Sequence, residues 1–242
     1  MTQAMTGIAA LAEILEGAAR DVRAVPKLTG AEPFDVATAY EIQRAGIARR
    51  ERRGERRIGV KMGFTSRAKM IQMGVDDVIW GQLTDAMLVE SALDLSELIH
   101  PRVEPEIVFL LGRDGFKVAV GFEILDSRYE DFKFTLPDVI ADNASAARFG
   151  FGAWHEPRDL ANVGLVMEID GRIAQTGSSA AILGDPVRSL RAAVRLARDA
   201  GTPLEPGSII LAGSATAAVP LPKDAHVRIT GAGLGSVEVT TK

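Results

Sequence analysis

The sequence predicts an α+β fold that is rich in β-structure, with a mainly antiparallel, curled sheet that forms a roll and a small helical N-terminal part. Two observations lead to this class. Apolar residues recur at helical spacing near the N-terminus, whereas most of the chain after Arg57 consists of short β-branched runs separated by glycines. We therefore expect a helical part over residues 1–57 and a β-rich main domain over residues 58–242.

Two helices are expected in the N-terminal part. Apolar residues at helical spacing predict the first over residues 8–22 and the second over residues 35–52. The basic stretch 49–57 contains interleaved glutamates and lies where the second helix would end. Because cations are favourable near a helix C-terminus, we interpret this stretch as a solvated helix end and not as a binding patch.

Short apolar runs predict the strands of the main domain. These runs lie at residues 58–64, 87–90, 103–111, 118–125, 164–169, 173–177, 208–212, 226–229 and 236–240. Asp170-Gly171 is a strong signal for a two-residue hairpin turn, and residues 231–235 indicate another turn. Asp185 and Pro186 supply the N-cap and first-turn proline of one more helix, whose apolar face predicts that it packs on the sheet.

Composition and charge narrow the classes of function. The net charge of −4 and the pI of about 5.5 leave no basic excess for a phosphate backbone. The absence of cysteine excludes a disulfide framework, a thiolate metal site and a cysteine nucleophile. No export signal or membrane-spanning run is visible in the sequence. We expect a cytoplasmic protein that acts on a small molecule, with no nucleic-acid or membrane partner.

Three glutamates point to metal chemistry. Glu104 and Glu106 lie two apart in an otherwise apolar run, so a strand places both on one face with Cα atoms roughly 6.5–7 Å apart. Two ionised carboxylates at that separation repel each other unless a cation or a proton compensates. Glu123 stands inside a second apolar run and also needs a partner. Three carboxylate oxygens suit Mg²⁺ or Mn²⁺.

The residues by themselves leave a second interpretation open. Glu104 and Glu106 would then point to solvent on an edge strand and pair with a nearby arginine, with Pro105 as the edge marker. Glu123 would be the buried partner of Arg128. Spacing alone does not decide between this arrangement and a metal site.

Two further charged residues are candidates for catalysis. Lys61 stands in an apolar strand before a glycine turn, and a lysine near a metal-bound anion can neutralise a carboxylate or move a proton. The alternative is a lysine on the outer face of a strand. Asp85 is a candidate to orient another group or to carry a proton, with an ordinary turn aspartate as the alternative.

Ser178, Ser179 and Thr216 are candidate substrate-binding residues. They lie in glycine- and serine-rich pieces that follow expected strands, where backbone N–H groups and hydroxyls can hold an anion. Ordinary turns explain these pieces equally well. Neither piece has the glycine spacing or the ending of a phosphate-binding loop, so nucleotide binding is not expected.

Five motifs make the chain resemble the fumarylacetoacetate hydrolase superfamily, in its hydratase/decarboxylase branch from the meta-cleavage catabolism of aromatic compounds. The motifs are residues 61–69 (KMGFTSRAK), 81–85 (GQLTD), 101–106 (PRVEPE), 122–128 (FEILDSR) and 141–145 (ADNAS). The resemblance covers the chain from Pro33 onward and implies a fumarylacetoacetase-like fold. By position it also implies that Glu104, Glu106 and Glu123 bind Mg²⁺ or Mn²⁺.

Within the branch, residues 126–138 and 216–220 resemble the members that decarboxylate 2-oxo-3-hexenedioate. The resemblance implies a divalent-metal-dependent carboxy-lyase that converts this unsaturated 2-oxo dicarboxylate to 2-hydroxypenta-2,4-dienoate and CO₂, with Lys61 near the dienolate. It further implies a homo-oligomer and a complex with a 2-hydroxypentadienoate hydratase.

The same resemblance leaves two other functions open. The protein could add water at the same metal site, as the hydratases do, or it could be a non-catalytic partner of a hydratase. The resemblance implies that carbon–carbon bond hydrolases of this superfamily activate water with an upstream pair of histidine and glutamate. This chain has no histidine before His100, so such a hydrolase is disfavoured. The link between Glu106 and Glu123 is shorter than the family pattern, which indicates either a true deletion or a mobile stretch that is absent from this sequence. A true deletion would affect how the active site closes.

Overall fold

The computed structural model describes residues 2–67, 70–71, 74 and 77–242. Its helices include α1 (Thr2–Arg20), α2 (Val36–Arg52), α4 (Leu136–Ala141) and α5 (Pro186–Asp199). The two expected N-terminal helices and the helix after Asp185 are confirmed. As N-caps, the side chains of Asp35 and Asp185 accept hydrogen bonds from the N–H groups of Thr38 and Val187. The short helix α4 was not expected.

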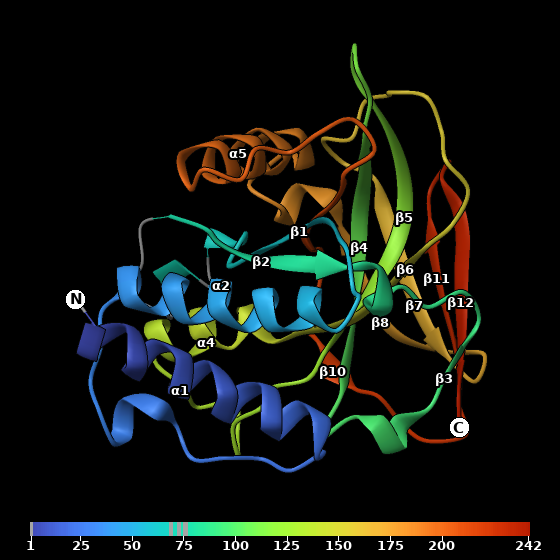
Figure 1. Ribbon diagram of the computed structural model, residues 1–242. Coiled ribbons are helices and arrows are strands. Elements are labelled where there is room, and N and C mark those ends of the chain that lie inside the picture. Colours follow the sequence, from blue (N-terminus) through green and yellow to red (C-terminus); the bar gives the residue numbers. More distant parts are fainter. Residues whose placement is uncertain (1, 68–69, 72–73, 75–76) are drawn as a thin grey trace.

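The strands form two sheets (Figure 1). The larger has the order β2 (Ile79–Thr84), β1 (Arg57–Gly63), β9 (Ile209–Ser214), β4 (Arg102–Leu111), β5 (Phe116–Leu125), β6 (Ala146–Phe151), with β10 (Val219–Pro220) paired to β4. The smaller has the order β3 (Ala92–Leu93), β12 (Gly235–Thr241), β11 (His226–Gly231), β7 (Gly164–Ile169), β8 (Arg172–Ser178). Within the described residues, only β1 with β9 and β12 with β3 run parallel. The expected antiparallel, β-rich fold is confirmed.

One apolar core lies between the two sheets. Ile107 and Val120 of the larger sheet belong to the same buried cluster as Val227 and Ile229 of the smaller sheet. The backbone of Gly231 approaches Val120 so closely that an added Cβ would lie 3.2 Å from its side chain. This packing curls the strands into a roll, as expected, and the outer strands are thereby brought toward one another.

The N-terminal helices pack on α4 beside the larger sheet (Figure 1). Ala12 of α1 and Ile42 of α2 share a buried cluster with Tyr129 and Ile140. Gln43 of α2 donates hydrogen bonds to the carbonyl oxygens of Trp80 and Ile140, each at 3.0 Å, and so ties the helix to β2 and α4. Among the described helices, none has the length and apolar content that crossing a bilayer requires.

The turns at 170–171 and 112–115 determine two hairpins. Asp170 and Gly171 have φ angles of 50° and 73°, as the expected two-residue turn requires. The short link between Glu106 and Glu123 is a tight connection in which the N–H of Gly112 donates to the oxygen of Gly115 at 2.8 Å. It joins β4 directly to β5, and the tip of this hairpin projects at the top of Figure 1.

Three expectations about local structure were wrong or incomplete. The strand expected over residues 87–90 is not formed, because its first residue, Met87, ends a 3₁₀ helix, η2 (Asp85–Met87). The neighbouring strand β2 and the later strand β6 were not expected. The last two residues of the motif 61–69, Ala68 and Lys69, lie outside the described residues.

Candidate metal centre

The three glutamates expected to bind a metal come together on β4 and β5. Glu104 and Glu123 are direct partners across these antiparallel strands, and Glu106 lies two residues further along the same face of β4. One carboxylate oxygen from each residue lies within 4.8 Å of the others. Strand β4 runs between β5 and β9, so the alternative of an edge strand pointing to solvent is excluded.

Burial gives this cluster its chemical character. Glu106 and Glu123 are both 0% exposed, and Oε1 of Glu106 and Oε2 of Glu123 have no hydrogen-bond partner in the described part of the chain. Burial, together with the charges of Glu123 and Glu104, raises the pKa of Glu106 well above its usual value. Burial likewise raises the pKa of Glu123, although Lys61 opposes this change. Such oxygens destabilise the fold unless a cation or proton joins them.

Lys61 is the cation that the fold supplies to this cluster. Its side chain is 4% exposed and its Nζ lies 3.0 Å from Oε1 of Glu123. In the sheet order, three strand spacings of about 4.8 Å separate β1 from β5, so the two side chains meet because the sheet is curled. Arg128, the partner of Glu123 in the alternative interpretation, pairs instead with Asp142.

The donor set fits a hard divalent cation. Glu106 and Glu123 are buried beside one ammonium group, and their oxygens without hydrogen-bond partners among the described residues lie on the same face as Glu104. Carboxylate oxygens in this arrangement are the ligands that Mg²⁺ and Mn²⁺ prefer. Glu104, Glu106 and Glu123 would therefore hold the ion, and Lys61 would lie at its edge.

A glycine at the end of β9 orients one of these carboxylates. The N–H of Gly213 donates a hydrogen bond of 2.6 Å to Oε2 of Glu106. Gly213 has a φ angle of 113°, and a Cβ added there would lie 2.1 Å from Oγ1 of Thr65. Only glycine meets both the backbone angle and the space available.

Replacing Gly213 by alanine is expected to weaken Mg²⁺ affinity by about 10–100-fold, the usual cost of losing a hydrogen bond that orients a metal ligand. The new methyl group would displace the N–H from Glu106. Isothermal titration with Mg²⁺ measures the effect. Gly207→Ala is the matched control, since Gly207 also has a positive φ, 96°, but nothing lies within 4 Å of an added Cβ. Equal affinities in the two variants would contradict the role of Gly213.

Asp85 is not brought to the triad. Its carboxylate accepts hydrogen bonds from the backbone N–H and from Nε of Arg56, both at 2.9 Å, and these bonds lower the pKa of Asp85. In the register of β1 with β2, Lys61 faces Gly81, whereas Asp85 follows the opposite end of the pairing. The carboxylate of Asp85 joins η2 to the start of β1, so the expected catalytic role of Asp85 gains no support from the geometry.

The hydroxyls of Ser178 and Ser179 are used within the fold. Ser179 is buried, and its hydroxyl donates to the oxygen of Leu160 at 2.5 Å and accepts from the N–H of Val163 at 2.7 Å. Ser178 donates to Oδ1 of Asn162 at 2.6 Å. Both serines hold the loop before β7 in place, so the expectation that they bind substrate gains no support from the geometry.

Thr216 lies nearer to the triad than the two serines. It follows Ser214, which faces Glu106 in the register of β4 with β9, and its N–H donates to the Ser214 hydroxyl at 3.1 Å. The two glycine- and serine-rich pieces do meet, because a Cβ added to Gly177 would lie 2.7 Å from Cγ2 of Thr216. The hydroxyl of Thr216 donates to the oxygen of Ala217 at 3.2 Å, and the substrate-binding role of Thr216 stays a prediction.

Reasoning from the sequence missed one part of the site, the turn Asn143–Ser145. The carbonyl oxygen of Ala144 accepts a hydrogen bond of 2.9 Å from Nζ of Lys61. The hydroxyl of Ser145 is buried and has no hydrogen-bond partner among the described residues. Residues 141–145 are one of the motifs of the family resemblance, but nothing in their composition placed them beside Lys61.

A triad of carboxylates, two of them fully buried, with an adjoining lysine inside a curled β-rich roll defines a metal-binding enzyme of the fumarylacetoacetase-like fold. Comparison with solved structures agrees with this class. The chain superposes with a TM-score of 0.92 on 4-oxalocrotonate decarboxylase from Pseudomonas putida G7, complexed with magnesium and adipate, at 38% identity and over 98% of each chain.

Comparison of sequences gives the family. The chain is 53% identical over 250 residues to a 4-oxalocrotonate decarboxylase from a Pseudomonas species, covering 97% of this chain and 98% of the relative. A 2-hydroxyhexa-2,4-dienoate hydratase from Comamonas testosteroni is 33% identical over 92% of each chain. No family model matches the chain.

The chain belongs to the family of the 4-oxalocrotonate decarboxylases, in the hydratase/decarboxylase branch of the fumarylacetoacetate hydrolase superfamily. Membership makes it an enzyme of the lyase class. The alignment of 250 residues exceeds the 242 residues of the chain, so the Pseudomonas relative has residues that this chain lacks. This agrees with the short link between Glu106 and Glu123, which the structure closes as a hairpin.

Proposed function

We propose that the protein decarboxylates 2-oxo-3-hexenedioate, also called 4-oxalocrotonate, to 2-hydroxypenta-2,4-dienoate and CO₂ with a divalent cation, Mg²⁺ or Mn²⁺. The observation that carries the proposal is the cluster of Glu104, Glu106 and Glu123, in which buried oxygens of Glu106 and Glu123 lack a hydrogen-bond partner among the described residues. The similar decarboxylases are named for this substrate, and the magnesium in the complex from Pseudomonas putida G7 supports the choice of cation.

The chemistry of the proposed substrate matches this site. Breaking the bond between C5 and the distant carboxylate releases CO₂, and its electron pair moves through the conjugated chain to the 2-oxo oxygen. When bound by the triad, the cation would act as a Lewis acid and stabilise the negative charge that develops on that oxygen. The three glutamates fix where this charge forms.

Lys61 has two roles in the proposed reaction. Its ammonium group is held 3.0 Å from Glu123 and therefore adds a positive charge beside the developing dienolate. It also holds a proton at Nζ, which can be given to the 2-oxo oxygen to form the 2-hydroxy product. The burial of Lys61, Glu106 and Glu123 keeps water away from these charges and so strengthens their interaction.

The test of this function follows CO₂ release and the absorbance of the dienoate product after mixing the protein with 2-oxo-3-hexenedioate and Mg²⁺. We expect turnover that a chelator abolishes and that added Mg²⁺ restores. Release of CO₂ that a chelator leaves unchanged would contradict the role of the metal. Supplying 2-hydroxypenta-2,4-dienoate in a parallel reaction tests the second candidate function, and hydration without decarboxylation would show that the protein is a hydratase.

The hydratase alternative rests on the similarity to hydratases, one of which is 40% identical over 176 residues and is named for 2-hydroxypent-2,4-dienoate. Because that compound is the product of the proposed reaction, a hydratase is also the partner we propose for this enzyme. A homo-oligomer is proposed for the enzyme itself. Sedimentation of the protein with and without such a hydratase measures both assemblies.

A further inference from the structure

Three consecutive residues next to Lys61 adopt a backbone conformation that their side chains disfavour. Asn143, Ala144 and Ser145 have φ angles of 52°, 53° and 58°, which lie in the left-handed region. Asparagine tolerates this region, but alanine and serine do so at a cost in free energy. Since strained backbone persists only where its surroundings impose it, specific contacts must hold this turn.

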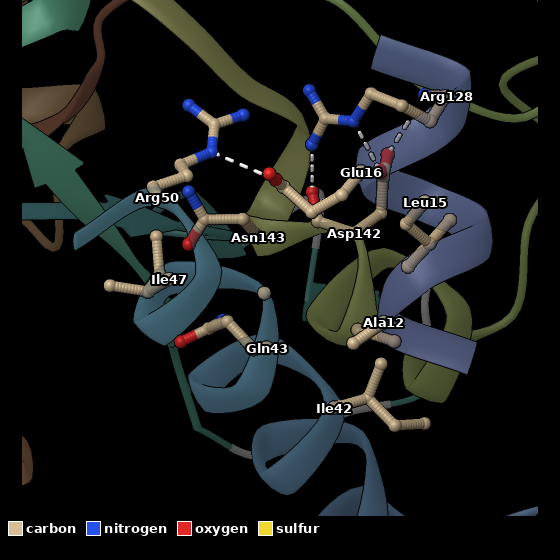
Figure 2. A pocket seen from close by; sticks show the side chains of 12 residues that line it. Ala12, Leu15, Glu16, Ile42, Gln43, Ile47, Arg50, Arg128, Asp142 and Asn143 are labelled. Atoms are coloured by element: carbon tan, nitrogen blue, oxygen red, sulfur yellow. Dashed lines mark hydrogen bonds and ion pairs between the residues drawn. The ribbon is translucent and has the colours of Figure 1, made fainter. Parts of the chain in front are cut away.

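Arg128 fixes the two ends of the turn. Its Nη2 donates to the oxygen of Asp142, which precedes the turn, and its Nη1 donates to the oxygen of Ala146 at 3.1 Å, just after the turn. Its Nε also pairs with the carboxylate of Asp142, as the dashed lines in Figure 2 show. One buried guanidinium group therefore determines the span of the turn.

Asn143 fixes the turn against the edge of the larger sheet. Its Oδ1 accepts from the N–H of Gln82 at 2.7 Å, and its Nδ2 donates to the oxygen of Gln82 at 2.9 Å. The side chain thus takes the place of a neighbouring strand at the outer edge of β2. The contact is close, because a Cβ added to Gly81 would lie 2.5 Å from the oxygen of Asn143.

The space behind Asn143 is not tightly filled. Asn143 lines a small cavity of about 20 Å³, together with Gln43 of α2 (Figure 2), and Oε1 of Gln43 has no hydrogen-bond partner in the described part of the chain. A cavity of that size has room for about one water molecule. Packing from this side leaves a gap beside Asn143, so the two hydrogen bonds to Gln82 contribute to holding the turn.

The docked turn presents one atom to Lys61. Across β1 and β2, Lys61 faces Gly81, the residue on which the turn rests. The oxygen of Ala144 consequently lies 2.9 Å from Nζ of Lys61, and Glu123 lies 3.0 Å from the same Nζ. A carbonyl and a carboxylate together fix the direction in which the ammonium group points.

We propose that Asn143 is a positioning residue for Lys61: by binding both backbone groups of Gln82 it holds the left-handed turn so that the oxygen of Ala144 fixes the ammonium group beside the triad. This inference rests on the proposed function, in which Lys61 carries the proton. Asn143 touches neither the triad nor Lys61 in any hydrogen bond between described residues, so it acts through Ala144.

The test is a double-mutant cycle between Asn143→Ala and Lys61→Met. We expect Asn143→Ala alone to lower kcat about tenfold or more, with KM and Mn²⁺ affinity changed less than about twofold, because misplacing a catalytic group affects the chemical step. In the Lys61→Met background the same substitution should leave kcat unchanged, since the residue through which it acts is gone. Equal losses in both backgrounds would overturn the proposal.

Two further variants guard against a simple loss of folding. Asn143→Asp keeps an oxygen for the N–H of Gln82 but replaces the donor by an oxygen that repels the carbonyl oxygen of Gln82, so its kcat should fall as in Asn143→Ala. Asn162→Ala is the matched control, because Asn162 is exposed and its Oδ1 accepts only from Ser178 in the described contacts. A kcat for Asn143→Asp equal to that of wild type would contradict the role of the hydrogen bond that Nδ2 of Asn143 donates.

Crystal structures separate this inference from the proposed function. In Asn143→Ala, Nζ of Lys61 and the oxygen of Ala144 should be more than 3.5 Å apart, beyond hydrogen-bonding distance. An unchanged distance of 2.9 Å would overturn the positioning role whatever the enzyme catalyses. If wild type releases no CO₂ but the distance lengthens as expected, the proposed function fails and the positioning of Lys61 stands.

Discussion

Replacing Glu106 by glutamine is expected to weaken Mg²⁺ affinity by roughly 100-fold or more, above the range for loss of an orienting hydrogen bond, and to abolish turnover. In the same variant the metal-free protein should become more stable. Glu106 is buried against Glu123 and Glu104, and the amide removes a repulsive charge while it keeps an oxygen for the N–H of Gly213. A gain of about 2–4 °C in Tm corresponds to about 1 kcal/mol in a chain of this size.

The gain in Tm of the metal-free Glu106→Gln protein depends on pH, and its direction follows from the pKa of Glu106. An unfolded glutamate titrates near 4.5, and burial raises the pKa of Glu106 well above this value in the folded, metal-free protein. The folded state therefore holds the proton more tightly, and its stability falls as pH rises from 4.5 through the raised pKa. Glutamine does not titrate, so the difference in Tm between Glu106→Gln and wild type should grow as pH rises through this window.

Metal binding should show the opposite trend in the wild-type protein. The cation must displace any proton from the carboxylates, so Mg²⁺ affinity is expected to increase with pH over the same window. Thermal denaturation with a chelator and with Mg²⁺, repeated across the pH series, measures both effects. The exposed Glu90 gives a matched control, Glu90→Gln, which should change neither Tm nor affinity appreciably. A metal-free Glu106→Gln protein that is less stable at high pH than wild type would contradict this explanation.

The strand pattern was enough to predict part of this site. Period two along β4 placed Glu104 and Glu106 on one face, and the structure confirms it. The pairing of Glu104 with Glu123 depends on the hairpin at 112–115, whose register follows from a turn that the sequence does not specify by pattern. Only the resemblance of the motifs identified Glu123 as the third ligand.

Other parts of the fold could not be predicted from the sequence pattern, for physical reasons. Strand β2 contains Gly81 and Gln82, which are weak β-formers, and it is stabilised by its register with β1 and by the side chain of Asn143. Helix α4 is different, because the capping box of Thr135 with Asp138 is a sequence pattern that indicates its N-terminus. The left-handed turn that follows has no such signal, because tertiary contacts impose it on Ala144 against its own preference.

Replacing Lys61 by methionine is expected to lower kcat by about 10²–10⁴-fold, the usual contribution of a positioned proton donor. Methionine keeps much of the apolar volume of the lysine side chain and removes both the charge and the proton. Metal affinity should be unchanged or higher, because the variant leaves Glu123 without its ammonium partner at 3.0 Å and so makes the triad more negative. Stopped assays of CO₂ release and titration with Mn²⁺ measure the two quantities.

This opposite behaviour of turnover and metal affinity distinguishes a catalytic lysine from a structural one. If Lys61 only neutralised the buried carboxylates, Mg²⁺ or Mn²⁺ would take over that role, and Lys61→Met would retain kcat once the site is saturated. Lys117 on β5 is exposed and lies 3.8 Å from Glu156, so Lys117→Met controls for the loss of a lysine at the surface. Because Glu106→Gln should lose affinity and turnover together, whereas Lys61→Met should lose turnover alone, the pair of variants separates holding the cation from moving the proton.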